Sequence, residues 1–236
     1  MIESSPLTVN LVRADIDEDE YDELISGLKD MRYTRERSYG FSLESVGETM
    51  LSGHLVITTP TNIQEFDEES QSVVKKQIDR TELIPFRIDL ANGFLEVFSN
   101  QDDVSKMKTR LGEASDWDIG LTEYPLDLSA LYDGLIKKDK DLSIKSMKIN
   151  NFSPDGNVTG SYHLKMFEGS EAENLLSDYG NNVSYLGAEF DNGTERVTVG
   201  FFRSGSIRLY SNSESDDQLL TTIKKAVNEA EVMPNA

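Results

Sequence analysis

The chain has 236 residues, with 43 acidic and 23 basic side chains, so its formal net charge is -20. It contains no cysteine, which excludes disulfides, thiol nucleophiles and cysteine-ligated metals in this chain. A charge of this size keeps a protein soluble and repels nucleic acid at long range, so a generic DNA-binding surface is not expected.

The sequence also indicates where the protein acts. Glu3 stands where a secretory signal has a basic residue, and no apolar run approaches the roughly 18 residues of a membrane span. We therefore expect a cytoplasmic protein that does not associate with membranes. The acidic residues are spread along the chain rather than gathered in a tail, which suits a salt-rich cytoplasm where charges are screened over short distances. The sequence leaves a salt-adapted source as a hypothesis.

The first elements expected are a short strand and a helix. Residues 7–12 form a β-prone run, and the acidic block 15–20 opens a helix with an apolar face made of Tyr21, Leu24, Ile25 and Leu28. A calcium-binding loop would need glycine at Glu20 and glutamate at Ser26. We therefore interpret the acidic block as a solvated helix start.

A hairpin and a charged stretch follow. Residues 38–43 and 51–58 predict two strands around Gly47 that close at Pro60. The stretch 63–78 is charged and has few apolar anchors, so we expect a weak exposed helix or a long loop there. Residues 83–90 alternate, with one apolar face made of Ile84, Phe86, Ile88 and Leu90. Asn92-Gly93 is a strong signal for a two-residue hairpin turn.

The break between two halves is expected within residues 114–125, where the only tryptophan, Trp117, should be a packing anchor. Beyond it we predict a helix over 127–137 and a second one over 171–179 that ends at Gly180 in a left-handed cap. The strands expected in this half are 142–152 and 158–167, joined by the turn Pro154-Asp155-Gly156-Asn157, and 183–190 and 196–203, joined at Asn192-Gly193.

An eight-residue segment occurs twice, at 93–100 and 205–212. Each copy begins with glycine after a strand-like run, continues as a short strand and ends in Ser-Asn before an amphipathic helix. Each helix start has an acid three residues past its cap, Asn100 with Asp103 and Ser213 with Asp216. The repeat predicts an α+β chain of two similar halves, 1–118 and 119–236, each an antiparallel sheet packed by a long C-terminal helix.

Alternation along the two short strands suggests a binding face. Aliphatic side chains at Leu95, Val97, Ile207 and Leu209 should face the helices, which sends Phe94, Phe98, Phe202, Arg208 and Tyr210 to the opposite face. A face with aromatics and an arginine is more typical of a binding surface than of a core. The alternative is that the other half, the N-terminal helix or a second subunit covers it.

The segment Phe202-Arg203-Ser204-Gly205-Ser206-Ile207 resembles the Phe-x-Ser-Gly-x-Ile segment of the TATA-box-binding protein family. In that family the segment leads through a strand into a long C-terminal helix, and the fold is an internal duplication whose concave sheet binds the DNA minor groove. The resemblance implies a TATA-binding-protein-like fold of the helix-grip type. It would place Phe94, Phe98, Arg208 and Tyr210 on nucleic acid. The chain departs from the family at Ser206, where the family has lysine, and in its net acidic charge.

No catalytic signature is found in the sequence. His54 and His163 both precede leucine on predicted hairpin strands, and a hydrogen-bonded strand histidine is a simpler interpretation than a metal ligand or general base. Phosphate loops, nucleophile elbows and paired-histidine metalloprotease motifs do not occur. We therefore expect a non-enzymatic interaction protein without cofactor or metal. It would bind another protein, or its own copy, through the aromatic sheet face or an acidic helical face. The alternative is a nucleic-acid-binding regulator of the TATA-binding type.

Overall fold

The computed structural model describes residues 7–69, 71–138, 142–153, 159–166, 169–191, 196–210 and 216–232. The chain is α+β with antiparallel strand pairing, as predicted. It divides into two compact units, which we call the first unit (14–121) and the second unit (1–13 together with 122–236). The predicted boundary lies after residue 118 and leaves residues 7–13 in the first half, whereas in the structure these residues belong to the second unit.

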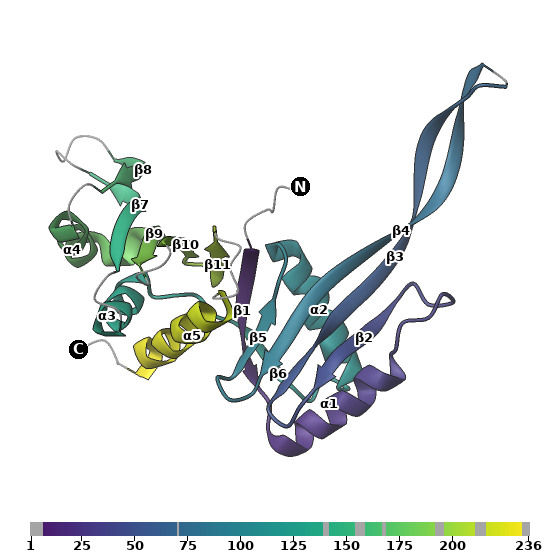
Figure 1. Ribbon diagram of the computed structural model, residues 1–236, viewed down its shortest axis with the longest axis horizontal. Helices are drawn as coiled ribbons and strands as arrows, with labels where there is room; N and C mark the ends of the chain where they lie inside the picture. Colours follow the sequence, from purple (N-terminus) through teal and green to yellow (C-terminus); the bar gives the residue numbers. More distant parts are fainter. Residues whose placement is uncertain are drawn as a thin grey trace. The chain divides into compact units, whose positions relative to one another are not determined.

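The first unit is a sheet in the order β2-β3-β4-β5 with two helices on one face (Figure 1). The helices meet where Gly27 approaches the Ala114 carbonyl. The elements are α1 (Glu18–Asp30), β2 (Tyr39–Val46), β3 (Met50–Asp67), β4 (Ser72–Asp89), β5 (Phe94–Val97) and α2 (Gln101–Ala114). Their buried side chains include the predicted apolar positions Tyr21, Leu24, Leu28, Ile84, Phe86 and Ile88. The alternation of residues 83–90 thus predicts Ile84, Phe86 and Ile88 correctly, but Leu90 is only half-buried, as is Ile25 of the helix, and Asp89 is buried instead.

Both helix starts in this unit follow from the local sequence. Asp17 caps α1, where its Oδ1 accepts from the Glu20 N–H at 2.9 Å while Glu20 Oε2 accepts from the Asp17 N–H at 2.9 Å. This reciprocal capping box explains the acidic block without a metal. Asn100 caps α2 by accepting from the Asp103 N–H at 3.1 Å, as predicted.

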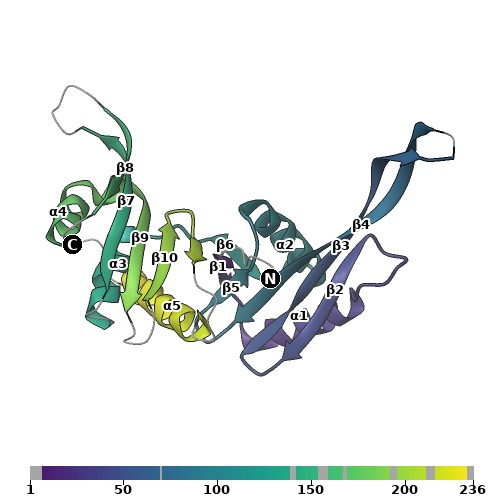
Figure 2. The same ribbon diagram turned by 45° about the horizontal axis from the view of Figure 1, so that its top comes forward.

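Strands β3 and β4 form an arm that leaves the sheet as a two-stranded ribbon (Figure 2). They pair along their whole length, from Met50 opposite Asp89 to Asp67 opposite Ser72. β2 accompanies β3 only as far as Ile57, and β5 accompanies β4 only from Phe86. We call residues 59–69 and 71–83 the arm.

The arm corrects two predictions. The stretch 63–78 is neither a helix nor a loop, and the hairpin does not close at Pro60, which lies opposite Asp79 within the ribbon. An outer ribbon has no core to face, so its residues need no apolar alternation and the signal for strands is lost. Pro60 is accommodated because the ribbon has no further strand beside it at this point.

The second unit is a sheet in the order β1-β11-β10-β9-β7-β8, with α3 and α5 on one face (Figure 2). Its elements are β1 (Leu7–Asp15), β6 (Gly120–Glu123), α3 (Leu128–Lys138), β7 (Ser143–Phe152), β8 (Gly160–Lys165), α4 (Gly169–Tyr179), a one-turn 3-10 helix (Gly180–Asn182), β9 (Val183–Asp191), β10 (Arg196–Phe202), β11 (Ser206–Leu209) and α5 (Asp216–Val232). β1 and β6 each run across a boundary between the units. Gly180 starts the 3-10 turn and does not form the predicted left-handed cap.

The strand-turn-strand-helix segment occurs in both units with the same hydrogen bonding. Gly93 and Gly205 both have left-handed backbone, at φ 68° and 89°, where glycine avoids the steric cost of a side chain. After the turn, Leu95 lies opposite Ile88 and Ile207 opposite Phe201. Each short strand ends with one more N–H bond back across the hairpin, from Phe98 to Pro85 and from Tyr210 to Thr198.

The second turn is one residue shorter than the first, and Asp89 occupies in the first unit the position that Phe202 holds in the second. The structure thus shows that this local segment occurs twice. Duplication of the complete halves stays a prediction. The turns 154–157 and 192–193, the Ser-Asn at 211–212 and the Ser213 cap lie outside the described residues.

Trp117 is not the packing anchor that sequence analysis expected, because 65% of its surface is exposed. Its indole lies against Gly112 of α2, and its backbone is left-handed at φ 69°, directly after Asp116 at φ 50°. The chain turns too tightly after α2 to bring this side chain into the core. Among the helices that the structure describes, none is both long and apolar enough to cross a lipid bilayer.

Candidate functional site

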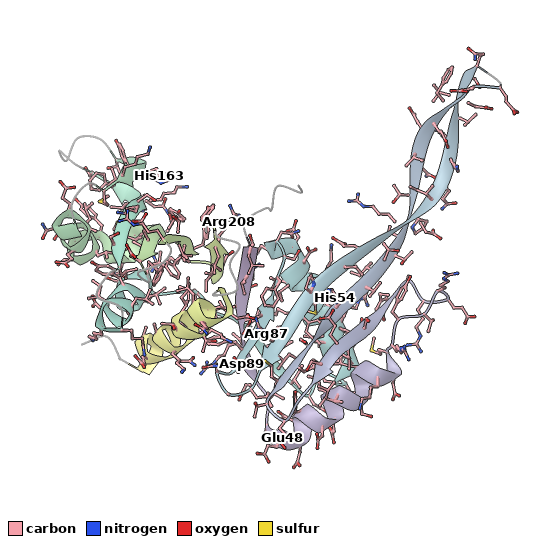
Figure 3. All side chains as sticks on the ribbon, in the orientation of Figure 1. Glu48, His54, Arg87, Asp89, His163 and Arg208 are labelled. Atoms are coloured by element: carbon pink, nitrogen blue, oxygen red, sulfur yellow. The ribbon has the colours of Figure 1, made fainter. Side chains whose placement is uncertain are left out.

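The second unit presents one sheet face away from α3 and α5, and two rows of residues build this outer face. His163 of β8, Lys148 of β7, Tyr185 of β9 and Phe202 of β10 lie directly opposite one another, strand to strand. Side chains at aligned positions point to the same face, so these four share the outer one. Figure 3 shows His163 and Arg208 on this unit.

The second row contains two glycines, and they explain how the face is shaped. Gly187 of β9 lies opposite Gly200 of β10, which in turn lies opposite Arg208 of β11. A Cβ on Gly187 would come 2.8 Å from the Tyr185 hydroxyl oxygen, and one on Gly200 would come 2.9 Å from the Tyr185 ring. The Tyr185 side chain therefore lies over glycine backbone, in space that larger residues would fill.

Aromatic contacts hold His163, Tyr185, Phe202 and Arg208 in a cluster in which all but the exposed His163 are half-buried. The ring centroids of Tyr185 and Phe202 are 4.9 Å apart, and those of His163 and Tyr185 are 5.7 Å apart. The guanidinium carbon of Arg208 lies 5.5 Å from the centroid of the Phe202 ring, a cation–π distance. Arg208 and Phe202, both proposed from sequence, are thus neighbours on this face.

These residues line an open groove of about 400 Å³, made by Lys148, His163, Ser184, Tyr185, Phe202 and Tyr210. We call it the aromatic groove. Tyr210 has 48% of its surface exposed, and none of the six lining residues is acidic. In a chain with 43 acidic residues and a net charge of -20, a groove bordered by cations and phenols stands out chemically.

The electrostatics of the aromatic groove favour an anionic ligand. In the described part of the chain, neither Lys148 nor Arg208 forms an ion pair with a carboxylate, and the buried Nε of Arg208 has no hydrogen-bond acceptor. Burial raises the pKa of Tyr185, and the nearby phenol of Tyr210 acts in the same direction, against the Ser146 hydrogen bond and the charge of Arg208. Tyr185 is therefore neutral at physiological pH and leaves the positive charge on this face uncompensated.

The first unit shows what the same hairpin looks like when its charges are paired. There Arg87 and Glu96 occupy the positions that Gly200 and Arg208 hold in the second unit. Glu96 is completely buried and accepts from Arg87 at 3.0 Å, and Arg87 also lies 5.2 Å from the Phe98 ring centroid. The arginine of the first unit is thus neutralised internally, whereas Arg208 is not.

The five residues predicted from sequence divide between the units. Phe202, Arg208 and Tyr210 come together at the aromatic groove. Phe94 is completely buried in the first unit, so it is not on a surface, and Phe98 is half-buried beside Arg87.

Sequence reasoning missed Tyr185 and Lys148 as groove residues. The available signal was the pair of glycines inside predicted strands, at 187 and 200, since glycine in a strand interior often marks a close approach over the sheet.

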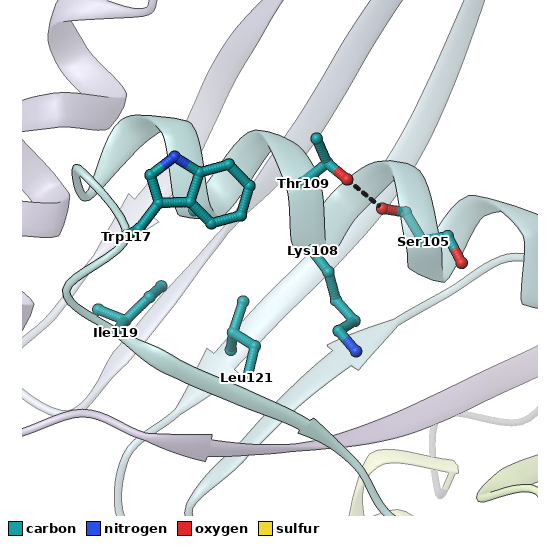
Figure 4. Close-up of a pocket in the computed structure, with 7 residues that line it drawn as sticks. Ser105, Lys108, Thr109, Trp117, Ile119 and Leu121 are labelled. Carbon is teal, nitrogen blue, oxygen red and sulfur yellow. Dashed lines mark hydrogen bonds between the residues drawn. The ribbon is translucent and has the colours of Figure 1, made fainter.

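A second hollow, of about 320 Å³, lies beside α2 in the first unit (Figure 4). Ser105, Lys108 and Thr109 line it from the helix, where the Thr109 hydroxyl donates to the Ser105 carbonyl at 3.0 Å, and Trp117, Ile119 and Leu121 close the other side. It contains one cation and no cluster of aromatics. We regard it as the weaker candidate.

The histidines do not form a catalytic or metal centre in the described residues. His54 Nδ1 lies 3.4 Å from Glu44 Oε1, while His163 packs edge-on against Tyr185. No group of three or more potential ligands that could hold a metal ion occurs within the described part of the chain.

Comparison with known proteins leaves the function to be argued from the groove itself. The chain matches no protein-family model, and no curated protein matches its sequence.

Proposed function

We propose that this is a non-enzymatic interaction protein that binds an acidic, aromatic-containing segment of a protein partner in the aromatic groove. Tyr185, Phe202 and Tyr210 provide apolar surface for an aromatic side chain, and Lys148 and Arg208 provide the charge for its acidic neighbours. Tyrosine and arginine are the residue types that carry binding energy at protein interfaces most often.

The observation that carries this proposal is the lack of any acidic residue in the lining of the groove. On a chain with 20 more acidic than basic residues, a groove lined without any carboxylate suits an anionic partner, and Glu189, further along the same face of β9, is paired with Lys145 at 3.3 Å. The comparison with the buried Arg87–Glu96 pair supports the same conclusion, because this sheet arrangement readily accommodates an internal counter-ion.

A peptide titration tests the proposal. The full chain, labelled with ¹⁵N, is titrated with a blocked Glu-Glu-Tyr-Glu-Glu peptide and with Lys-Lys-Tyr-Lys-Lys as the matched control. We expect chemical-shift changes at Tyr185, Phe202 and Tyr210 with the acidic peptide alone. Replacing both Lys148 and Arg208 by glutamine should weaken binding by about 5- to 30-fold, since each partly exposed charge contact contributes about 0.5–1 kcal/mol. Equal shifts with both peptides, or none at the groove, would refute the proposal.

A nucleic acid is the second candidate, and one observation favours it. Phe202 carries a stacked arginine and lies beside Tyr185, an arrangement on which bases of single-stranded nucleic acid stack. The resemblance to TATA-box-binding proteins also implies a nucleic-acid ligand, in that family a DNA duplex bound in its minor groove. Fluorescence anisotropy with a labelled oligothymidine, over NaCl from about 0.1 to about 1 M, tests it because phosphate contacts weaken steeply with salt. We expect no binding at any salt concentration, and binding at any of them, whether it weakens with salt as phosphate contacts do or persists, would favour this candidate.

A further inference from the structure

The tip of the arm has the chemistry that the aromatic groove lacks. Residues 65–69 read Glu-Phe-Asp-Glu-Glu, and Phe66 has 56% of its surface exposed. Among the described residues, Glu68 and Glu69 have no ion pair, whereas Glu65 is paired with Lys76 at 3.2 Å. The tip is therefore an exposed phenyl ring surrounded by carboxylates.

The arm is an unusual structure for a segment without a partner. From residue 59 to residue 67 it extends about 30 Å at the usual rise of a strand. A lone two-stranded ribbon is at best marginally stable in water. Phe66 lies opposite Val73, which is 63% exposed, so the tip gathers apolar surface without burying it. Large exposed apolar side chains at the end of a ribbon are what an anchoring segment requires.

Charge and shape complementarity connect the two surfaces. The groove is lined by aromatic, cationic and hydroxyl-bearing side chains with no acid, and the tip provides one aromatic ring with acids on both sides of it. The arm extends past Ile57 and Phe86, where the pairing with β2 and β5 ends, so no strand of the described residues lies beside its tip. The opposite charge of the two surfaces favours this contact at short range, against the net repulsion between two chains of charge -20.

We propose that the partner of the aromatic groove is the arm tip of a second copy of this chain, with Phe66 seated among Tyr185, Phe202 and Tyr210 and with Glu68 and Glu69 facing Lys148 and Arg208. This inference rests on the proposed function of the groove and identifies its occupant. Since the two surfaces differ, the contact is head-to-tail. Each bound copy then offers a further arm and groove, so association continues beyond the dimer unless a ring closes.

Two variants separate the surfaces. Phe66→Ala removes the anchor and leaves the groove intact, while Lys148→Glu with Tyr210→Ala alters the groove and leaves the tip intact. All three side chains are exposed, so the fold should be unaffected, which circular dichroism checks. Leu83→Ala is the matched control, because Leu83 lies on the same hairpin with 59% of its surface exposed but far from the tip.

The measurement is sedimentation velocity from about 10 µM to about 1 mM protein, the range in which weak contacts dissociate. The wild type and Leu83→Ala should gain mass with concentration beyond that of a dimer, or reach a closed ring. Each of the two variants alone should bind at least about tenfold more weakly. Mixed together they should form a one-to-one dimer and nothing larger, because only one intact tip and one intact groove meet.

The outcomes distinguish this inference from the proposed function. If the acidic peptide binds the groove while the wild type stays monomeric at every concentration, the groove has another occupant and the inference falls alone. A monomer whose groove signals change in Phe66→Ala indicates that the tip binds within its own chain, which also overturns it. Failure of both the peptide titration and the self-association would reject the groove as a binding site.

Discussion

Glu96 is a buried charged residue in the core of the first unit. Its carboxylate is fully buried and pairs with Arg87, which is 19% exposed, at 3.0 Å. A buried charge of this kind is tolerated only with its partner, since desolvation costs several kcal/mol for each ion. In sequence, a glutamate in a four-residue strand gives no hint of complete burial.

We predict that Arg87→Leu lowers the free energy of unfolding by about 3–5 kcal/mol, because it leaves Glu96 buried without its guanidinium partner. The double variant Arg87→Leu/Glu96→Leu should recover most of that loss, as replacement of both charges by apolar groups is often neutral. Urea denaturation of the wild type, both single variants and the double variant gives the coupling energy. A double variant no more stable than Arg87→Leu would contradict this account.

Tyr185 makes the stability of the second unit sensitive to alkaline pH. Burial and the Tyr210 phenol raise the pKa of Tyr185, so the folded chain favours the neutral phenol. Above pH ~10 the unfolded chain releases the Tyr185 proton while the folded chain still holds it. The stabilising contribution of Tyr185 to folding is therefore complete below that pH and is lost as the pH rises further. Relative to Tyr185→Phe, the wild type should lose stability as the pH rises above about 10. A constant difference in unfolding free energy between the two proteins would show that Tyr185 does not titrate in this way.

Two contacts between helices differ in whether the helix needs a glycine at the point of contact. A Cβ on Gly27 of α1 would lie 1.7 Å from the Ala114 carbonyl oxygen at the end of α2, and the two helices would have to separate. At Gly134 of α3, the nearest atoms belong to Ala226 of α5 and lie 3.5 Å or more from a built Cβ, which is ordinary contact. A side chain is therefore excluded at Gly27 but fits at Gly134.

We predict that Gly27→Ala destabilises the protein by about 1–3 kcal/mol, the usual cost of forcing atoms into a packed contact. Gly134→Ala, the matched control, should be neutral or more stable by up to about 1 kcal/mol, because alanine is the better helix former. Thermal unfolding of both variants beside the wild type provides the measurement. Equal effects at the two positions would mean that α1 and α2 do not meet at Gly27.

The elements that sequence predicts well are those whose local chemistry and core pattern agree. Asn92-Gly93 marks the place of its turn because Gly93 adopts left-handed backbone, and Asp89 accepts from the Asn92 N–H and side-chain amide at 3.2 and 2.8 Å. The turn itself spans residues 90–93, between the paired residues Asp89 and Phe94, and is not the two-residue turn predicted. The Asn100 cap is equally local. By contrast, the arm has no buried face, so period-two alternation has no cause there and its strands cannot be recognised from apolar spacing.

The candidate site was predictable only in part, for a similar reason. Strand alternation correctly separates Arg208 and Tyr210 from Ile207 and Leu209, since the latter pair is buried. It does not show that β8, β7 and β9 bring His163, Lys148 and Tyr185 beside Phe202, because strand order depends on contacts between residues distant in sequence. Nor does it show that Phe94 is covered on both sides of its strand.

At the scale of the whole molecule, net charge governs how salt acts on folding and on association. With 43 acids against 23 bases, the compact chain repels itself, and this repulsion opposes folding. Added salt shortens the screening distance from about 10 Å at 0.1 M to about 3 Å at 1 M, which weakens the repulsion. The proposed contact between arm tip and aromatic groove joins opposite charges, so the same screening weakens it.

We therefore predict opposite salt dependences in one protein. The unfolding temperature should rise as NaCl increases from about 0.1 to about 1 M and then level off, because little repulsion remains to be screened once the screening distance falls near contact. Over the same range, self-association of the wild type should weaken. The difference in association between the wild type and Phe66→Ala should persist, because apolar burial is not screened by salt. Calorimetry and sedimentation on the same samples provide the two readouts, with KCl as a control for ion identity. An unfolding temperature that is flat or falls with NaCl would show that surface repulsion is not what limits the stability of this acidic chain.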